Sequence, residues 1–435
     1  MTNARFNLGN VTAILGTQWG DEAKGKLVDI LSKEFDIIAK ATGGANAGHT
    51  IHVPNPLNPA ETAKFVFHLV PSGMIHDGKV AVLGNGLVIH IPSLIEELDT
   101  LKQYKIDLAG RFFISDRAHI VFDYHKKIDA LEEEQKGEAK VGTTLRGIGP
   151  AYLDKISRRG VRIGEILDFD SFSDHVRKTF MQLKSQYKGL KHDIDEELKN
   201  LRDFIGVLKP FITDTSLFLN KAADNGKTIL IEGSQGTHLD IDHGTYPFVT
   251  SSNPTIGGIY TGTGIGHGKI SSVVGIMKAY VTRVGSGVFP TELTDETGNA
   301  LREKGGEYGS TTGRPRRCGW FDALVGKYAV MINGLTSINL TKLDVLDDLE
   351  TIKICTGYKY KGKNLESMPA AVEMYKELEF DYIEMKGWKT DTSKAVKFED
   401  LPENAQNYVL KIEELVRCPV NFIGVGVRRD QIIHR

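Results

Sequence analysis

Short apolar runs that end in glycine-rich polar segments recur along the chain. Val11–Leu15 leads into the first such segment, and Asp36–Lys40 leads into the second. Apolar runs of this length, bounded by turn residues, are typical of buried strands. The same pattern predicts further strands at Phe65–Leu69, Lys79–Leu83, Thr228–Glu232, Ser271–Thr282, Ser337–Thr341 and Val420–Gly424.

Between these runs, apolar residues recur with helical spacing. Lys26–Lys33, Ser93–Tyr104 and Asp123–Lys136 are predicted helices, the last with an acidic run, Glu132–Glu134, on its expected solvated face. The alternation of strands and helices favours an α/β fold with a large, mostly parallel central sheet flanked by helices. Residues 171–225, rich in lysine and glutamate, are predicted to form a peripheral helical insertion.

Composition indicates a globular protein without a general affinity for polyanions. Its 435 residues, of which 40% are hydrophobic, suffice for an extensive core, and length alone would allow about three domains. The net charge of −2 gives no field to attract nucleic acid or a membrane surface. Because no apolar run suits a signal peptide or a membrane span and the three cysteines are scattered, we expect reduced thiols and a cytoplasmic location.

The segment Gly16–Lys26 has the features of a phosphate-binding loop. Its glycines and Lys26 have the spacing of a P-loop, in which backbone N–H groups and a lysine surround phosphate oxygens at a helix start. Leu27 stands where a P-loop has serine or threonine, so the carboxylate of Asp21 is the expected ligand for the Mg²⁺ that accompanies a nucleotide. The alternative is a simple turn between a strand and a helix.

A second glycine-rich loop, Gly43–Thr50, follows the next predicted strand. Loops at the carboxyl ends of parallel strands meet at one edge of the sheet, where open α/β sheets bind ligands. His49, flanked by small residues in this loop, is a candidate catalytic group, and the alternative is a structural histidine.

Two later segments carry side chains suited to anions. Val141–Pro150 is small and polar, and it is followed by Ser157–Gly160 with two arginines, a combination suited to a phosphate monoester. Gly309–Arg317 combines glycine and threonine with three arginines, which predicts a mobile anion clamp. In both cases the alternative is a solvated basic surface.

Two polar positions at strand ends are suited to nucleotide bases. Gln235 offers a donor and an acceptor to a purine edge, and Asp344 can accept hydrogen bonds from N1–H and N2–H₂ of guanine, which adenine does not offer. The phosphate loop lies near the amino end of the chain and Asp344 near the carboxyl end. Both ends must therefore meet in one site, which argues for one large domain over residues 1–435.

Six motifs occur in the order Gly16–Glu22, Gly43–Thr50, Gly147–Tyr152, Asp240–Pro247, Thr311–Arg314 and Thr341–Asp344. Together they resemble the adenylosuccinate synthetase family over nearly the whole chain. The resemblance implies a P-loop-like GTP site and the Mg²⁺-requiring ligation of IMP and L-aspartate to adenylosuccinate, GDP and phosphate, the committed step toward AMP. It also implies a homodimer.

The resemblance further implies roles for individual residues. Asp21 would remove the N1 proton of IMP and, with the Gly48 carbonyl, ligate Mg²⁺, while His49 would donate to the transferred phosphoryl group. Lys24, rather than Lys26, would contact the phosphates. The implied catalytic set is Asp21, Lys24, His49 and Gln235.

The implied substrate sites overlap. GTP would contact Gly20, Asp21, Glu22, Ala23, Lys24, Gly25, Lys26, Gly48, His49, Thr50, Arg316, Lys342, Leu343, Asp344, Gly424, Val425 and Gly426. IMP would contact Asp21, Lys24, Asn46, Ala47, Gly48, His49, Thr144, Gln235, Thr250 and Arg314, with Arg158 reaching into the IMP site of the other subunit. Aspartate would contact Ser310, Thr311, Thr312, Gly313, Arg314 and Arg316.

The chemistry agrees with these residues. Loss of the N1 proton puts negative charge on O6, which attacks the γ-phosphorus of GTP, and the aspartate amine then displaces phosphate from the 6-phosphoryl intermediate. Two positions depart from the family pattern, since Ala23 replaces a glycine and Pro315 interrupts a basic run. A GTP-binding switch protein is the alternative, although it would have no use for Arg314 and Gln235.

Overall fold

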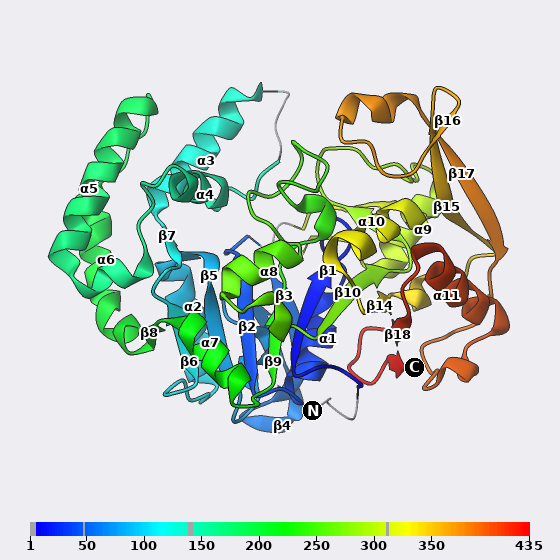
Figure 1. Cartoon of the computed structure of the whole chain (residues 1–435), viewed down its shortest axis with the longest axis horizontal. Coiled ribbons are helices and arrows are strands. Elements are labelled where there is room, and N and C mark those ends of the chain that lie inside the picture. The colour runs from blue at the N-terminus through cyan, green and yellow to red at the C-terminus, as the bar shows by residue number, and fades with distance from the viewer. Residues whose placement is uncertain (1–5, 47, 138–141, 310–312) are drawn as a thin grey trace.

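The computed structural model describes residues 6–46, 48–137, 142–309 and 313–435, and its central sheet carries helices on both faces (Figure 1). The sheet has eleven strands in the order β19-β18-β14-β10-β1-β9-β2-β5-β6-β8, with β7 paired to β5 beside this path. Its neighbouring strands run parallel except for β18 and β19. The α/β fold with a mostly parallel sheet, predicted from the sequence, is confirmed.

The long strands of this sheet fall on predicted apolar runs. Strands β1, β2 and β14 are buried along their whole length, so even their polar residues, such as Lys40 in β2 and Asn339 in β14, are shielded from water. The strand bounds are β1 (Val11–Gly16), β2 (Ile37–Gly43), β5 (Val80–His90), β6 (Phe112–Ser115), β7 (His119–Val121), β8 (Ile212–Thr213), β9 (Ile229–Glu232), β10 (Ser272–Lys278), β14 (Ser337–Thr341), β18 (Val420–Gly424) and β19 (Ile432–His434).

Smaller sheets lie outside the central one. The strand expected at Phe65–Leu69 belongs to one of them, because β4 (Asn58–Phe67) pairs with β3 (His49–Asn55) in a hairpin. Strand β11 (Val281–Arg283) likewise leaves the central sheet and pairs with β12 (Arg317–Gly319). The remaining sheet consists of β13 (Phe321–Asp322), β15 (Thr351–Tyr360), β16 (Lys363–Leu365) and β17 (Leu378–Lys386).

Side chains along β1 alternate between two packed layers. Ile14 joins an apolar cluster with Leu27 and Val28 of α1 (Lys24–Ser32), which covers one face. Ala13 and Leu15 join the larger cluster on the other face, together with α8 (Ile256–Thr263). Both faces of the central strands are therefore closed to water, and ligands must approach the sheet at an edge.

The other helices are α2 (Ile91–Gln103), α3 (Asp123–Gln135), α4 (Ile148–Ile156), α5 (Phe169–Gln186), α6 (Ile194–Leu208), α7 (Thr215–Asp224), α9 (Glu296–Gly305), α10 (Ala323–Asn333) and α11 (Glu403–Val416). Short 3₁₀ turns are η1 (Ser72–Ile75), η3 (Ile163–Leu167), η4 (Lys209–Phe211), η5 (Thr237–Leu239), η6 (His267–Lys269), η7 (Leu343–Leu346), η8 (Val372–Glu377) and η9 (Phe398–Asp400).

The range predicted as a helical insertion, 171–225, has two parts. Helices α5 and α6 pack against each other at one end of the molecule (Figure 1). The last part instead joins the central sheet, where β8 pairs with β6 and α7 packs on β5 and β6.

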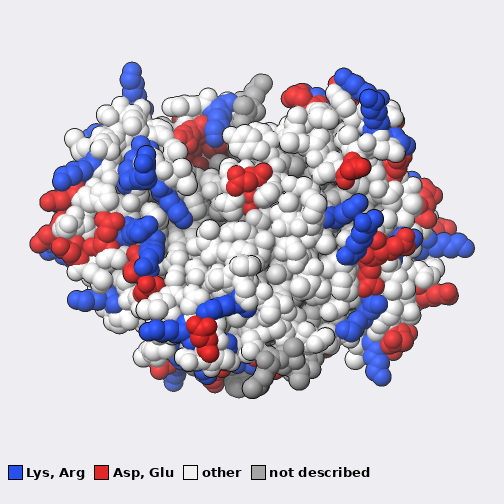
Figure 2. Space-filling model, in the orientation of Figure 1, with Lys and Arg blue, Asp and Glu red and all other residues white. Residues whose placement is uncertain are grey.

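The surface carries charges of both signs. On the face shown in Figure 2, lysine and arginine are interspersed with aspartate and glutamate toward both ends of the molecule, and few charged side chains lie across the middle. In the part of the chain that the structure describes, no helix combines the length and apolarity needed to cross a bilayer. All three cysteines are buried and unpaired, as expected.

Candidate active site

A cavity of about 640 Å³ opens at the carboxyl edge of the central sheet. The loops that follow β1, β2, β9, β14 and β18 line it, so the predicted convergence of the two glycine-rich loops is confirmed. The predicted site residues in its wall are Gly20, Asp21, Ala23, Lys24, Gly25, Lys26, Asn46, Gly48, His49, Thr50, Thr144, Gln235, Thr250, Arg314, Arg316, Lys342, Asp344, Gly424 and Gly426.

Other predicted site residues lie elsewhere. Glu22 is buried beneath the first loop, and Leu343 and Val425 belong to the apolar core. Gly313 and Arg158 are exposed and do not line the cavity. Ala47, Ser310, Thr311 and Thr312 lie outside the described residues.

The buried carboxylate of Glu22 holds the first glycine loop. Its Oε1 accepts hydrogen bonds from the backbone N–H groups of Gln18 (3.0 Å) and Gly20 (2.9 Å), and its Oε2 lies 2.5 Å from Lys24 Nζ. A charged acceptor on two loop N–H groups fixes their direction more firmly than a neutral one would. Glu22 therefore supports the loop from below, while Lys24 lies at the cavity.

Ala23 precedes α1 in the left-handed conformation, with φ 66° and ψ 36°. Glycine adopts this conformation readily, whereas it strains an alanine. Asp21 also has a positive φ, of 60°. The chain thus keeps the sharp turn of the loop at position 23 despite the departure from glycine.

The two ends of the chain meet at the cavity. Lys26 Nζ donates hydrogen bonds to the carbonyl oxygens of Gly426 (2.8 Å) and Gln431 (2.7 Å). Thr341 Oγ1 donates to the carbonyl oxygen of Glu22 (2.9 Å). The first glycine loop and the turn that carries Lys342 and Asp344 are therefore neighbours, as the sequence predicts.

His49 is paired with Glu232, a buried residue at the end of β9 that sequence reasoning missed. Nδ1 of His49 contacts Glu232 Oε1, Lys40 Nζ lies 3.8 Å from the same oxygen, and the Ser72 N–H donates to Oε2 at 2.9 Å. Burial alone would raise the pKa of Glu232, but His49 and Lys40 outweigh it and lower the pKa to about 2. Because Glu232 is a carboxylate, Nδ1 of His49 carries the shared hydrogen, and Nε2 is left for the cavity.

Gln235 and Asn46 form a polar pair in the cavity wall. Gln235 Nε2 donates to Asn46 Oδ1 at 3.4 Å, and Gln235 Oε1 is buried with no hydrogen-bond partner among the described residues. A Cβ at Gly16 would lie 2.2 Å from the Gln235 carbonyl oxygen, so only glycine permits this approach of the loops after β1 and β9. A buried acceptor without a partner is suited to a ligand with an N–H or O–H donor.

Two carboxylates of α3 hold the third polar loop. Asp129 accepts hydrogen bonds from Thr143 Oγ1 (2.9 Å) and the Gly147 N–H (3.0 Å), and Glu133 accepts one from the Gly142 N–H (2.9 Å). The prediction that the acidic run of this helix forms a solvated face is wrong for Glu133, which is only 6% exposed. The helical pattern could not show that the following loop folds back onto this side chain.

The segment Gly309–Arg317, called the basic loop below, brings arginines to the first glycine-rich loop (Gly16–Lys26) and to the third polar loop (Val141–Pro150). Arg316 Nε lies 3.0 Å from Asp21 Oδ2, and Arg316 Nη1 donates to Glu307 Oε2 at 2.6 Å. A Cβ at Gly142 would lie 3.8 Å from Arg314 Nη1, which places Arg314 beside the third loop. Arg314 and Arg316 therefore lie at the cavity from one short segment.

Lys342 and Asp344 occupy the turn after β14. Lys342 has a φ of 60°, and its Nζ donates to the Gly305 carbonyl oxygen (2.6 Å) and to Glu307 Oε1 (2.8 Å). Burial raises the pKa of Asp344, opposed by Lys342 and Lys26, and Asp344 Oδ1 has no hydrogen-bond partner in the described part of the chain. Such a carboxylate is suited to a ligand that brings N–H donors.

Sequence reasoning missed several residues of the site because no local pattern marks them. Glu232 and His49, for example, are 183 positions apart, and each is unremarkable in its own segment. The buried residues of the site or its support that were missed are Asp129, Glu133, Glu232, Lys278, Arg283 and Glu307. The strand order brings Glu232 to the predicted loops, whereas Asp129 and Glu133 meet a loop that folds back onto α3.

Oxygen atoms at the first loop fit a Mg²⁺ ion. Asp21 and Gly48 both line the cavity, and Asp21 Oδ2 lies beside Arg316 while Oδ1 remains for a metal. Leu27, at the position of the P-loop serine or threonine, has no hydroxyl to offer a metal, and its side chain is fully buried. Within the described ranges there is no group of three or more His, Cys, Asp or Glu residues that could hold a metal ion.

Comparisons with known proteins show the family of the chain. A family model described as adenylosuccinate synthetase matches residues 13–433. The chain is 50% identical over 422 residues to adenylosuccinate synthetase of Trichlorobacter lovleyi, covering 96% of each chain. It is 48% identical over 430 residues to that of Dictyostelium discoideum, covering 97% of this chain and 98% of the relative.

A solved structure of adenylosuccinate synthetase from Plasmodium falciparum has the same fold, with a TM-score of 0.93 and 45% identity over 98% of this chain and 100% of that chain. The matches span nearly the whole length, as did the motifs read from the sequence. On these grounds the chain belongs to the adenylosuccinate synthetase family.

Proposed function

We propose that the cavity holds GTP, IMP and L-aspartate together, with Asp21 where they react. The chain is a ligase of AMP biosynthesis that joins IMP and L-aspartate to adenylosuccinate at the expense of GTP, and the alternative of a GTP-binding switch is not supported. One observation carries the assignment of residues. The first glycine loop, His49 and the Lys342–Asp344 turn all open into a single cavity.

The positions in this cavity divide among the substrates. The triphosphate of GTP would lie on the N–H groups and Lys24 of the first loop, and its base would lie at Lys342, Asp344 and Gly426. IMP would lie between the second and third loops, against Asn46, Thr144, Gln235, Thr250 and Arg314. Aspartate would lie under the basic loop, which includes residues outside the described ranges, with Arg316 between it and GTP.

Asp21 is proposed as the general base. Its carboxylate would take the proton from N1 of IMP, which leaves negative charge on O6. O6 then attacks the γ-phosphorus, GDP leaves, and the aspartate amine displaces phosphate from C6 with loss of a proton. Phosphoryl transfer of this kind depends on positioning and charge neutralisation, which the loop N–H groups, Lys24 and the arginines supply.

His49 would donate to the transferred phosphoryl group through Nε2. Since Nδ1 already carries the hydrogen shared with Glu232, donation from Nε2 requires a doubly protonated ring. Burial lowers the pKa of His49, and Glu232 opposes this effect. The negative charge of a bound triphosphate would favour the imidazolium further, so we expect His49 to take up a proton as GTP binds.

Mg²⁺ is the cofactor that these oxygens suit best. Asp21 Oδ1 and the Gly48 carbonyl would hold it together with nucleotide oxygens. When bound, the ion would neutralise the charge of the β- and γ-phosphates. With or without the ion, Asp21 would face the cavity with its Oδ2 beside Arg316.

We further propose a homodimer in which Arg158 completes the IMP site of the other subunit. Arg158 is exposed just beyond α4 and does not line the cavity of its own chain. On the same helix Leu153 and Ile156 are 47% and 76% exposed, which suits a buried subunit contact.

Mixing two inactive variants tests the shared site. In a dimer of Asp21→Asn and Arg158→Ala subunits, one site has both residues intact, so random mixing should restore about a quarter of the original activity. No recovery in mixed dimers that have been shown to form would contradict a role for Arg158 across the interface.

A cytoplasmic location without a nucleic-acid partner is also proposed. The three cysteines are buried and unpaired, as in proteins of reducing compartments. The net charge is −2, and the face in Figure 2 shows no continuous basic stripe.

An omission assay tests the proposed function directly. Purified protein with GTP, Mg²⁺, IMP and L-aspartate should form adenylosuccinate, and leaving out any one of the four should stop product formation. GTP turnover at an undiminished rate without IMP would contradict the proposal, because the phosphoryl group would then be going to water.

A further inference from the structure

Glu307 is a fully buried carboxylate at the base of the basic loop. Its backbone carbonyl oxygen accepts a hydrogen bond from the Arg316 N–H (2.8 Å), and its side chain accepts one from Arg316 Nη1 (2.6 Å). The adjacent residues Tyr308 and Pro315 form an antiparallel bridge. Both the pairing of the two strands at the base of the basic loop and the direction of the Arg316 side chain therefore depend on Glu307.

Two lysines and a tyrosine also bind this carboxylate. Lys278 Nζ lies 2.9 Å from each of its oxygens, Lys342 Nζ lies 2.8 Å from Oε1, and Tyr280 Oη donates to Oε1 at 2.5 Å. Burial would raise the pKa of Glu307, but Lys278, Lys342 and Arg316 outweigh it and hold the pKa well below its usual range. Glu307 is therefore ionised whenever the protein is folded near neutral pH.

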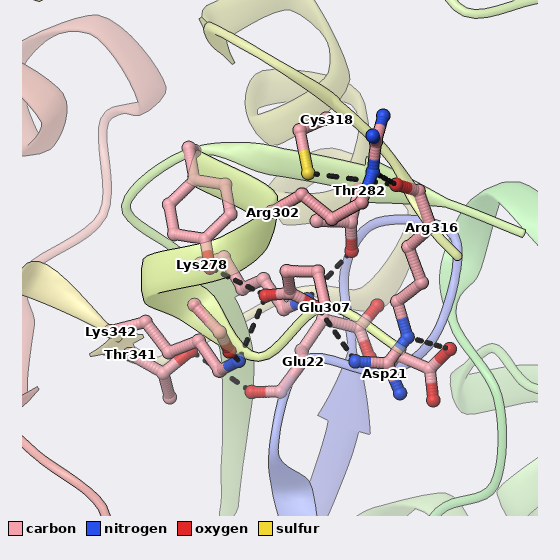
Figure 3. A network of polar contacts seen from close by, with 12 residues as sticks. Asp21, Glu22, Lys278, Thr282, Arg302, Glu307, Arg316, Cys318, Thr341 and Lys342 are labelled. Carbon is pink, nitrogen blue, oxygen red and sulfur yellow. Dashed lines mark hydrogen bonds and ion pairs between the residues drawn. The ribbon is translucent and has the colours of Figure 1, made fainter. Parts of the chain in front are cut away.

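The contacts form a continuous path between two parts of the cavity. Figure 3 shows Glu307 between Lys342 on one side and Arg316 on the other, with Asp21 beyond Arg316. Lys342 belongs to the turn with Asp344, whereas Arg316 belongs to the basic loop. When a buried carboxylate loses one of its partners, no water takes the partner's place. The contacts with the remaining partners therefore shift as well.

We propose that Glu307 is a positioning residue that couples guanine recognition at Lys342 to the aspartate-binding and catalytic side of the cavity through Arg316. The inference rests on the proposed function, since it takes Asp21 as the base and the basic loop as the aspartate site. The Glu307 carboxylate would contact none of the three substrates, but it would fix the positions of both Lys342 and Arg316. Binding of the correct base then favours the arrangement that binds aspartate, and the reverse holds equally.

Glu307→Gln tests the coupling, with Tyr280→Phe as the matched control. The glutamine keeps the shape but removes the charge that holds both cations, so KM for GTP and KM for aspartate should rise together, each by about tenfold, while kcat falls. KM for IMP should stay within about twofold of its original value. Tyr280→Phe removes a hydrogen bond to the same carboxylate but neither link, so all three KM values should be unchanged.

Lys342→Met provides a second test that leaves the Glu307 carboxylate in place and removes one of its cations. Lys342 side-chain atoms are 22% exposed, so the variant should fold even if Glu307→Gln does not. Coupling predicts that the variant raises KM for aspartate by about fivefold as well as KM for GTP, although in the described part of the chain the Lys342 ammonium group donates to Gly305 and Glu307 and not to the basic loop.

The outcomes separate the inference from the proposed function. If the unaltered protein makes adenylosuccinate but Lys342→Met changes KM for GTP alone, the coupling through Glu307 is overturned and the function stands. Equal effects of Tyr280→Phe and Glu307→Gln on all three KM values would also overturn the coupling. A nonspecific loss of packing around Glu307 would then explain both variants. If the unaltered protein makes no product with all substrates present, the proposed function itself fails.

Discussion

Glu232→Gln isolates the contribution of one buried charge to the proposed role of His49. The glutamine retains an oxygen that can accept the Nδ1 hydrogen of His49, so the ring keeps its direction, but the negative charge beside it is lost. Lys40, 3.8 Å from Glu232 Oε1, then adds an uncompensated positive charge near the ring. An imidazolium that could donate from Nε2 becomes harder to form.

The structure gives the magnitude. The pKa of Glu232 is lowered from 4.5 to about 2, which corresponds to about 3 kcal/mol of favourable interaction between the carboxylate and its surroundings. Because the folded-state pKa lies below the unfolded one, this stabilisation is complete above about pH 4.5 and is lost as the pH falls toward 2. At pH 7 the free energy of unfolding of the variant should therefore be smaller by at most about 3 kcal/mol, because the share due to His49 requires its imidazolium form.

Catalysis should suffer separately from stability. Loss of one well-placed donor to a phosphoryl group in the transition state costs roughly 100-fold in kcat, whereas KM for GTP and IMP should change little. Adenylosuccinate formation at saturating substrates measures kcat at a temperature where circular dichroism shows the variant folded. Ser72→Ala is the matched control, because it removes one hydrogen bond to Glu232 (3.3 Å) but leaves the charge, and its kcat should stay near the original.

A double variant tests whether Glu232 acts through His49. If it does, Glu232→Gln should have little further effect in a His49→Asn background, because the two residues then act as one unit. A kcat within about threefold of the original in folded Glu232→Gln, or multiplying effects in the double variant, would refute the reasoning.

Three further substitutions test other parts of the site. Asp21→Asn should lower kcat by about 1,000-fold while the dissociation constant for GDP, measured by calorimetry, stays within about twofold, and near-normal turnover would remove Asp21 from the chemistry. Asp344→Asn should lower kcat/KM for GTP roughly 10- to 100-fold and favour XTP, whose O2 can accept from the asparagine amide; unchanged selectivity in competition assays would exclude Asp344 as the base reader. Ala23→Gly should relieve the strain at φ 66° and raise the free energy of unfolding by up to about 1 kcal/mol in urea titrations, and a decrease would show that the alanine is not strained.

Local patterns in the sequence determined the elements and the reacting loops. Apolar runs that end in glycine predicted β1 and β2, because a strand buried on both faces is rich in apolar side chains whatever its neighbours are. The six motifs identified the family for the same reason, since each is a contiguous segment whose glycines and polar residues serve one turn. Strands β15 and β17 show the limit, because they pair with each other outside the central sheet and no local pattern indicates this place.

Only the tertiary structure decided how distant side chains are paired. Lys26 and Gly426 are 400 positions apart, and they meet because β18, which precedes Gly426, lies only three strands from β1, which precedes Lys26, in the sheet order. Glu232 and Glu307 are single acidic residues at ordinary positions, and nothing near them in the chain distinguishes them from solvated carboxylates. Their charges matter because folding removes water and brings cations from other segments to them, and the partners of a buried charge are set by strand order rather than by sequence distance.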